Sequence, residues 1–139
     1  MKKIFLITTG GTIASRQTSD GLAPSVTSDE ILEYIPEVDE ICSITTYGLF
    51  NLDSTNVCYQ HWISMVKCLK EHYSSYDGFV ITHGTDTMAY TAAALSYMVQ
   101  NSMKPIVITG SQRPLASVDS DARSNLLNAI VFACDEHAH

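Results

Sequence analysis

The stretch Ile4-Phe5-Leu6-Ile7-Thr8-Thr9-Gly10-Gly11-Thr12 is the part of the sequence from which we predict the fold. Its nearly continuous apolar run, Ile4–Thr8, is typical of a parallel strand that is buried on both faces. The two glycines that follow permit a sharp turn and a close approach of the backbone to a ligand. We therefore predict an α/β fold with a binding site that begins where this first strand ends.

The rest of the chain alternates between strand and helix patterns. Further strands are predicted at 41–47, 79–82 and 105–109, and helices over 62–73, 88–99 and 122–133. A capping box formed by Thr27 and Glu30 predicts a short additional helix that ends at Pro36. This order predicts one parallel sheet with helices on both faces, a flavodoxin-like or Rossmann-like three-layer sandwich. We expect the strand order 2-1-3-4, with a ligand crevice at the carboxyl ends of strands one and three.

The composition excludes several classes of protein. The 139 residues include 8 Lys and Arg against 15 Asp and Glu, which gives a net charge of −7. Proteins that bind nucleic acid or anionic membranes need a basic face, so the charge argues against both partners. The apolar runs have the length of strands, and neither a membrane span nor a signal peptide is predicted. The four cysteines form no CxxC pair, so we expect free, buried thiols and a cytoplasmic protein.

Two later strands end in loops that are similar to the first one: Thr82-His83-Gly84-Thr85-Asp86-Thr87 and Thr109-Gly110-Ser111-Gln112-Arg113-Pro114. In the predicted sheet, Thr12 faces Thr85 and Asp86 across one pocket. A threonine hydroxyl becomes a nucleophile when a neighbouring group accepts its proton, and backbone N–H groups in glycine turns stabilise an oxyanion. Threonine and glycine at strand ends are also ordinary turn residues, so the residues alone leave both interpretations open.

Other functions find less support in the residues. The first loop lacks the GxGxxG and GxxxxGK[ST] patterns of nucleotide-binding loops. The histidines and cysteines do not share the spacing of a zinc site, and we expect no metal and no cofactor. We interpret His83 as a structural histidine that orients its turn rather than as a general base.

Five segments together resemble the L-asparaginase family. Residues 9–14 and 83–87 are similar to its two signatures, and residues 51–55 resemble its substrate-binding segment in the form seen in cytoplasmic type I enzymes. Residues 110–114 and 121–126 are similar to later segments of the family, in the same order. The resemblance covers essentially the whole chain. It implies an amidohydrolase that converts L-asparagine into L-aspartate and ammonia.

The resemblance also implies roles for individual residues. Thr12 is the expected nucleophile, which forms an acyl-enzyme ester, and Thr85 and Asp86 form a second catalytic group together with a lysine. Substrate-binding residues are expected at Asp53, Ser54, Thr55, Thr85, Asp86 and Ser111. Asparagine carries an α-ammonium and an α-carboxylate, so its pocket needs a fixed anion and several hydrogen-bond donors.

The chain departs from the family pattern in two ways. The lysine and the smaller C-terminal domain, which a neighbouring subunit uses to complete the pocket, would follow His139. We therefore expect residues 1–139 to be the N-terminal α/β domain of a homo-oligomeric protein, truncated before its last strand and inactive alone. A natural four-stranded domain is the alternative. Leu22 stands near the position of a tyrosine that assists the nucleophile in many members, so the base for Thr12 is undetermined.

Three other functions stay open beside asparagine hydrolysis. Glutaminase activity and the ammonia-releasing component of a tRNA-dependent amidotransferase both fall within the same family. A methylene group changes binding in a pocket by only about 1–3 kcal/mol, so the sequence does not decide between asparagine and glutamine. The third is a non-catalytic ligand-binding module on a flavodoxin-like frame.

Overall fold

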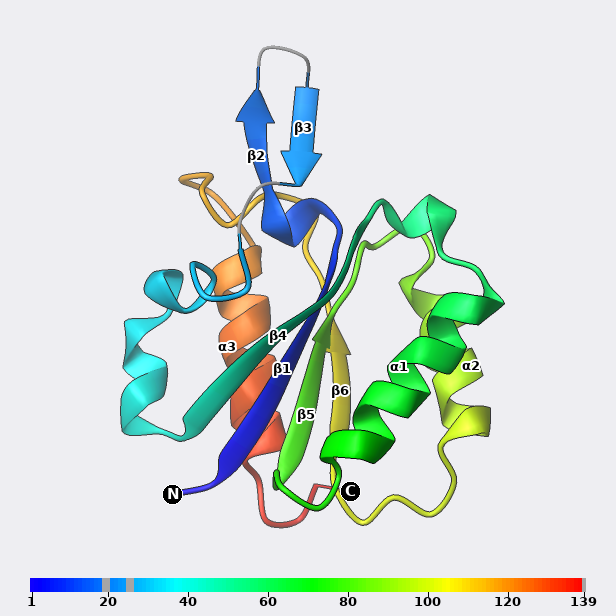
Figure 1. Ribbon diagram of the computed structural model, residues 1–139. Helices are drawn as coiled ribbons and strands as arrows, with labels where there is room; N and C mark the ends of the chain where they lie inside the picture. The colour runs from blue at the N-terminus through cyan, green and yellow to red at the C-terminus, as the bar shows by residue number, and fades with distance from the viewer. Residues whose placement is uncertain (19–20, 25–26, 139) are drawn as a thin grey trace.

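The computed structural model describes residues 1–18, 21–24 and 27–138. Its centre is a four-stranded sheet in the order β4-β1-β5-β6, in which every neighbouring pair is parallel (Figure 1). The strands are β1 (Lys3–Gly10), β4 (Ser43–Leu52), β5 (Gly78–Thr82) and β6 (Ile106–Thr109). Counted along the chain within this sheet, the order is the predicted 2-1-3-4, and this prediction is confirmed.

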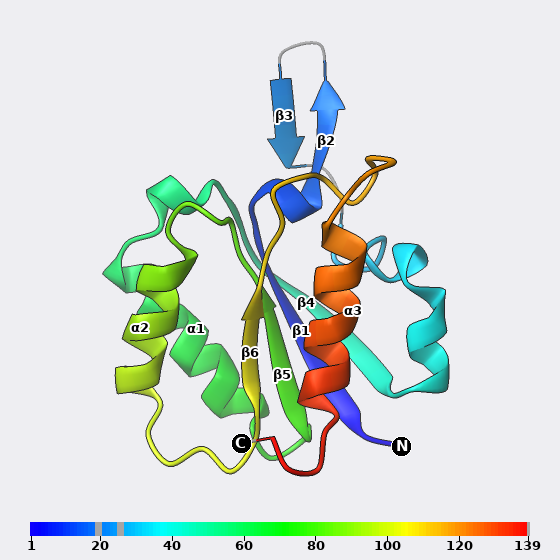
Figure 2. The ribbon, with the colours of Figure 1, turned by 180° about the vertical axis from the view of Figure 1, so that it is seen from behind.

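Helices cover both faces of the sheet. The helices α1 (Tyr59–His72) and α2 (Met88–Met98) lie on one face, and α3 (Ala122–Ala133) lies on the other (Figure 2). Two short 3-10 helices, η2 (Leu32–Tyr34) and η3 (Pro36–Glu40), cover the second face beside α3. The predicted three-layer α/β architecture is therefore confirmed.

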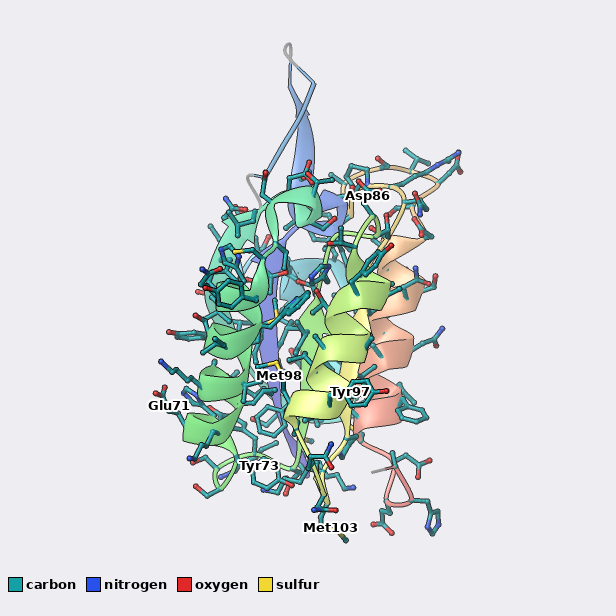
Figure 3. The ribbon with its side chains drawn as sticks, turned by 90° about the vertical axis from the view of Figure 1, so that its right-hand side faces the viewer. Glu71, Tyr73, Asp86, Tyr97, Met98 and Met103 are labelled. Carbon is teal, nitrogen blue, oxygen red and sulfur yellow. The ribbon has the colours of Figure 1, made fainter. Side chains whose placement is uncertain are left out.

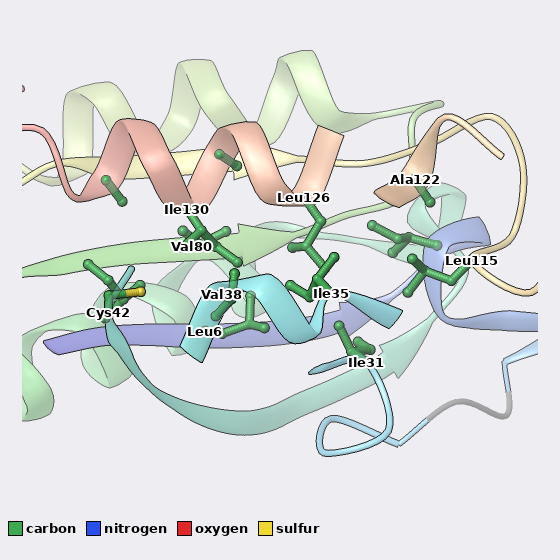
Figure 4. Packing of buried hydrophobic residues seen from close by; sticks show 14 of the residues in the cluster. Leu6, Ile31, Ile35, Val38, Cys42, Val80, Leu115, Ala122, Leu126 and Ile130 are labelled. Carbon is green, nitrogen blue, oxygen red and sulfur yellow. The ribbon is translucent and has the colours of Figure 1, made fainter. Parts of the chain in front are cut away.

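The side chains of β1 divide between two hydrophobic cores. Successive residues of a strand point to opposite faces of the sheet. Ile4 and Leu6 accordingly pack with α3 and the 3-10 helices, whereas Phe5 and Ile7 pack with α1 and α2. Figure 4 shows Leu6 in the first core, close to Val38 of η3. Both faces of β1 are buried, which explains why its sequence is continuously apolar rather than alternating.

The segment after β1 contains two strands that were not predicted. It contains an antiparallel hairpin of β2 (Ser15–Thr18) and β3 (Gly21–Pro24), which projects from the carboxyl end of the sheet (Figure 1). The polar sequence of β2 shows no alternation of apolar and polar residues, which is the usual signal for a strand. The hairpin was not predicted, because backbone pairing between β2 and β3 defines it and no hydrophobic pattern marks it in the sequence.

The predicted helix before Pro36 is also wrong in type. The capping box itself forms, because Thr27 N donates to Glu30 Oε2 at 2.8 Å and Glu30 N donates to Thr27 Oγ1 at 3.3 Å. The chain then continues as turns and 3-10 helix, since Pro36 disfavours the α conformation in the residue before it. The capping signal was correct, but the backbone N–H groups of residues 32–35 donate to the carbonyl three residues earlier, which gives turns and 3-10 helix in place of an α-helix.

The second large strand is longer than predicted. It extends to Leu52, five residues past the predicted end, so Tyr47 lies inside β4 and not at its end. Gly48 hid this continuation, because glycine is an unfavourable residue for a strand.

The four cysteines are free thiols in the structure, as predicted, but their predicted burial is correct only for Cys42 and Cys68, because Cys58 is exposed and Cys134 is half-buried. No helix in the described ranges is long and apolar enough to cross a membrane.

Candidate functional site

Glycines allow the loops that follow β1, β4 and β5 to approach one another closely. Gly10 and Gly11 adopt φ values of 95° and 79°, which side chains of L-residues disfavour. A Cβ on Gly11 would lie 2.6 Å from Cα of Gly84, and a Cβ on Gly84 would lie 2.6 Å from Cβ of Ser54. Gly11 N also donates a hydrogen bond to Leu52 O at 3.0 Å. The backbones of Gly11 and Gly84 meet because neither residue has a side chain, and the Ser54 side chain packs directly against Gly84.

These loops form a pocket of about 390 Å³ at the carboxyl end of the sheet. It is lined by Gly11, Thr12, Ser15, Asp53, Ser54, Gly84, Thr85 and Asp86. The prediction that Thr12 shares one pocket with Thr85 and Asp86 is thus confirmed. A larger groove of about 510 Å³ lies between α1 and α2 toward the opposite end of the sheet, but it lacks this concentration of hydroxyls and carboxylates (Figure 3).

Asp53 supplies one of the two carboxylates of the pocket. It precedes the 3-10 helix η4 (Ser54–Asn56) and caps it, since Asp53 Oδ1 accepts from Thr55 N at 2.9 Å and from Thr55 Oγ1 at 2.8 Å. The backbone N–H of Thr55 is the main cause that lowers the pKa of the Asp53 carboxyl below its usual 3.8. Asp53 is therefore an anion at neutral pH, and its exposed side chain places this negative charge where the pocket meets solvent.

Thr85 and Asp86 lie in the loop after β5 and line the same pocket as Thr12. Thr12 and Thr85 are half-buried, whereas Asp86 is exposed at the rim (Figure 3). The Thr87 hydroxyl in the same loop donates to the Ser54 carbonyl oxygen at 2.6 Å and so ties the Thr85–Asp86 loop to η4. The pocket thus combines hydroxyl groups from all three loops with two carboxylates.

Two of the predicted substrate-binding residues do not line this pocket. Thr55 is exposed, and its hydroxyl donates to Asp53 instead. Ser111 is buried, and its hydroxyl donates to the Arg113 carbonyl oxygen at 2.6 Å. Ser111 follows β6, which lies one strand beyond β5, whereas the pocket lies over β4, β1 and β5. The loop after β6 resembles the loops after β1 and β5 in sequence, and this similarity did not reveal that Ser111 lies one strand away from the pocket.

Ser15 was not among the predicted site residues, yet it lines the pocket. Its hydroxyl donates to the Gly11 carbonyl oxygen at 2.9 Å, which braces the turn that carries Thr12. The only sign of this role in the sequence was that a serine stands four residues after Gly11, within reach of its carbonyl oxygen.

His83 lies beneath the pocket and does not line it. It is completely buried, and burial lowers the pKa of its imidazole below 6.5. Its Nδ1 is 2.7 Å from the Gly84 carbonyl oxygen, which agrees with the prediction of a histidine that orients its turn. Over the described part of the chain, no group of three or more His, Cys, Asp and Glu side chains is arranged to hold a metal ion.

Comparisons with known proteins show what this chain is similar to. A family model described as "Asparaginase, N-terminal" matches residues 3–139. L-asparaginase 1 of Escherichia coli is 44% identical over 138 residues, which are 96% of this chain and 41% of that protein. A glutamyl-tRNA(Gln) amidotransferase subunit of Pyrococcus furiosus is 42% identical over 138 residues, 97% of this chain and 32% of that protein.

A solved structure extends the similarity to the fold. The crystal structure from Campylobacter jejuni described as "Probable Cytoplasmic L-asparaginase" matches with a TM-score of 0.89 at 32% identity, over 99% of this chain and 41% of that one. The chain thus spans about two-fifths of the length of the curated L-asparaginases that it matches, 40% for the protein of Thermococcus kodakarensis and 41% for that of Escherichia coli.

Proposed function

Because the chain belongs to the asparaginase family, we propose that the complete protein hydrolyses L-asparagine to L-aspartate and ammonia. The observation that carries this proposal is the single pocket that holds the hydroxyls of Thr12, Ser54 and Thr85 beside the carboxylates of Asp53 and Asp86. These groups match the chemistry of asparagine, which presents an ammonium, a carboxylate and an amide within one small molecule.

Recognition of the α-amino acid group rests on the charged and polar residues of the pocket. The ammonium of the substrate binds beside Asp53 and Asp86, because a cation removed from water needs an anionic partner. The hydroxyls of Ser54 and Thr85 donate hydrogen bonds to the substrate carboxylate. Thr55 contributes through Asp53, whose carboxylate it holds with two hydrogen bonds.

Hydrolysis then proceeds in two steps through Thr12. Its Oγ1 attacks the carbon of the side-chain amide, the C–N bond breaks, and the nitrogen leaves as ammonia after it receives a proton. The resulting ester between Thr12 and the aspartyl group is cleaved by water, which releases aspartate and restores the hydroxyl. Division of the reaction into acylation and deacylation replaces one difficult step with two easier ones. Backbone N–H groups of the glycine loops stabilise the oxyanion.

A test of this proposal measures ammonia release by the complete protein and its Thr12→Ala variant. Loss of the nucleophile is expected to lower kcat by at least about 10³-fold. Thr45→Ala is the matched control, because it removes the same hydroxyl from an exposed position within β4. Mass spectrometry after incubation with an electrophilic asparagine analogue is expected to find the adduct on Thr12. Full turnover by Thr12→Ala contradicts the proposal. Binding of the ligand with neither ammonia release nor an adduct also contradicts it and favours a non-catalytic binding module.

A second candidate function is the release of ammonia within a tRNA-dependent amidotransferase. The observation that favours it is the 42% identity to the glutamyl-tRNA(Gln) amidotransferase subunit of Pyrococcus furiosus. The net charge of −7 disfavours a large contact with RNA. Ammonia release that requires a charged tRNA supports this candidate, whereas release from free asparagine supports the first. Faster release from free glutamine identifies a glutaminase.

We further propose that residues 1–139 form the N-terminal domain of a homo-oligomeric cytoplasmic enzyme. The family model supports the N-terminal assignment, and the description of the Campylobacter jejuni protein supports the cytoplasmic location. None of the eight residues that line the pocket is the lysine that the family resemblance requires. The 139-residue chain alone is therefore expected to release ammonia only very slowly. Turnover by this chain at ordinary enzyme rates contradicts that expectation.

A further inference from the structure

Three side chains beneath the pocket connect the end of β5 to both helices on one face of the sheet. Trp62 of α1 lies with Nε1 2.9 Å from Oγ1 of Thr91 on α2. The same Thr91 Oγ1 lies 2.9 Å from Nε2 of His83, and His83 Nδ1 lies 2.7 Å from the Gly84 carbonyl oxygen. His83 and Thr91 are completely buried.

The chemistry of these groups gives the chain of hydrogen bonds one direction. The indole N–H of Trp62 only donates, and the carbonyl of Gly84 only accepts. His83 must therefore carry a proton on Nδ1, and burial favours its neutral form, so its Nε2 accepts. The Thr91 hydroxyl accepts from Trp62 and donates to His83. Every donor in this chain of hydrogen bonds has an acceptor only if the bonds run in one direction, from Trp62 through Thr91 and His83 to Gly84.

The end of this chain is the peptide that precedes Thr85. A Cβ on Gly11 would meet Gly84 at 2.6 Å, and a Cβ on Gly84 would meet Ser54 at 2.6 Å, so the orientation of Gly84 affects all three loops of the pocket. The peptide bond between Gly84 and Thr85 is planar and trans. A carbonyl held toward His83 therefore directs the N–H of Thr85 away from His83 and fixes the plane from which the Thr85 and Asp86 side chains extend.

We propose that His83 is a positioning residue for Thr85 and Asp86, which holds the Gly84 carbonyl oxygen through Nδ1–H while Thr91 and Trp62 fix the imidazole from the other side. This inference rests on the proposed function, since it assigns the reaction to the Thr85–Asp86 loop. His83 exchanges no proton with the substrate, because it is enclosed by protein and does not line the pocket.

Two variants of similar size separate the two ring nitrogens. In His83→Asn the side-chain amide nitrogen occupies the place of Nδ1 and still reaches Gly84 O, but the bond to Thr91 is lost. In His83→Gln the amide group occupies the place of Nε2 and still reaches Thr91, but Gly84 O loses its donor. Each variant removes one buried hydrogen bond, so the two are expected to lower the melting temperature by similar amounts.

The kinetic result is expected to differ between the variants. In the complete protein, His83→Gln lowers kcat by about 10- to 100-fold, the cost of a displaced catalytic group. His83→Asn keeps kcat within about threefold of the wild type, and the shape of its pH–rate profile is unchanged. Equal losses in the two variants would assign His83 a merely structural role. Disappearance of one limb of the pH profile in His83→Asn would identify a general base. Either outcome overturns the proposal.

A measurement without turnover tests the same inference if the proposed function fails. Nitrogen-15 NMR of the ligand-free protein is expected to find the His83 proton on Nδ1, with Nε2 unprotonated. The backbone amide signals of Thr85 and Asp86 are expected to shift in His83→Gln and to remain close to wild type in His83→Asn. A proton on Nε2, or amide signals that do not respond to His83→Gln, overturns the proposal whether or not asparagine is hydrolysed.

Discussion

Substitution of Gly11 by alanine is the most direct test of how the pocket is assembled. Gly11 has φ 79° and ψ −177°, a combination that is almost confined to glycine. The Cβ of an alanine would lie 2.6 Å from both Cα and N of Gly84. These atoms belong to the backbone and have no rotamer by which to move aside, so one of the two loops must shift.

The expected cost follows from these two effects. Backbone strain at such a conformation costs about 1–3 kcal/mol, and the overlap with Gly84 costs about 1–3 kcal/mol as an overpacked contact. Gly11→Ala is therefore expected to lower the free energy of unfolding by about 2–6 kcal/mol, a large part of the stability of an ordinary domain. The loop shift also separates Thr12 from Thr85, and a displacement of about 1 Å costs about 10²-fold in kcat.

Gly48→Ala is the matched control. A Cβ there would lie 3.7 Å from Thr8 Oγ1 and 3.9 Å from Ser28 Oγ, which are ordinary contact distances. Alanine is favoured over glycine within a strand by about 0.5–1 kcal/mol, so this variant is expected to be as stable as the wild type or slightly more stable. Urea unfolding followed by the fluorescence of Trp62, the single tryptophan, measures both variants. A free energy of unfolding for Gly11→Ala within about 1 kcal/mol of the wild-type value would refute this account of the pocket. Equal destabilisation by Gly48→Ala would refute it too.

Three further predictions use other parts of the structure. Thr91→Val leaves a buried imidazole nitrogen and an indole N–H without partners and is expected to lower stability by about 1–3 kcal/mol for each group, whereas Thr91→Ser retains the hydroxyl; equal unfolding midpoints for the two variants contradict this. The lowered pKa of Asp53 stabilises the fold above pH 3.8, and this contribution disappears as the pH falls through the folded-state pKa, so the melting temperature of Asp53→Asn should decline less than that of the wild type below about pH 4. Burial raises the pKa of Cys42 to about 12, so iodoacetamide at about pH 8 should label the exposed Cys58 first; peptide mass spectrometry that finds Cys42 labelled in the folded protein refutes this.

Much of the architecture was predictable because it depends on patterns between near neighbours in the chain. The apolar run of β1 has no polar face, so it indicated a strand buried between two layers. Alternation of strands and helices then restricted the sheet to a few topologies, and the carboxyl ends of its central strands indicated the pocket. The shared pocket of Thr12, Thr85 and Asp86 was predicted for this reason, since each lies in the loop that follows one of these strands, whereas their catalytic roles are implied only by the family resemblance.

Other features depend on how distant segments dock, and local patterns carry no information about them. Thr55 and Ser111 looked equivalent to the pocket residues, but the geometry of η4 turns one hydroxyl toward Asp53, and the position of β6 leaves the other outside. Trp62 and Thr91 are 29 residues apart on two helices, and their contact depends on how both helices pack against the sheet. Short-range hydrophobic periodicity establishes which face of an element is buried. A hydrogen bond between two elements also requires their relative placement to within a few tenths of an ångström. That placement arises only when the whole core is packed.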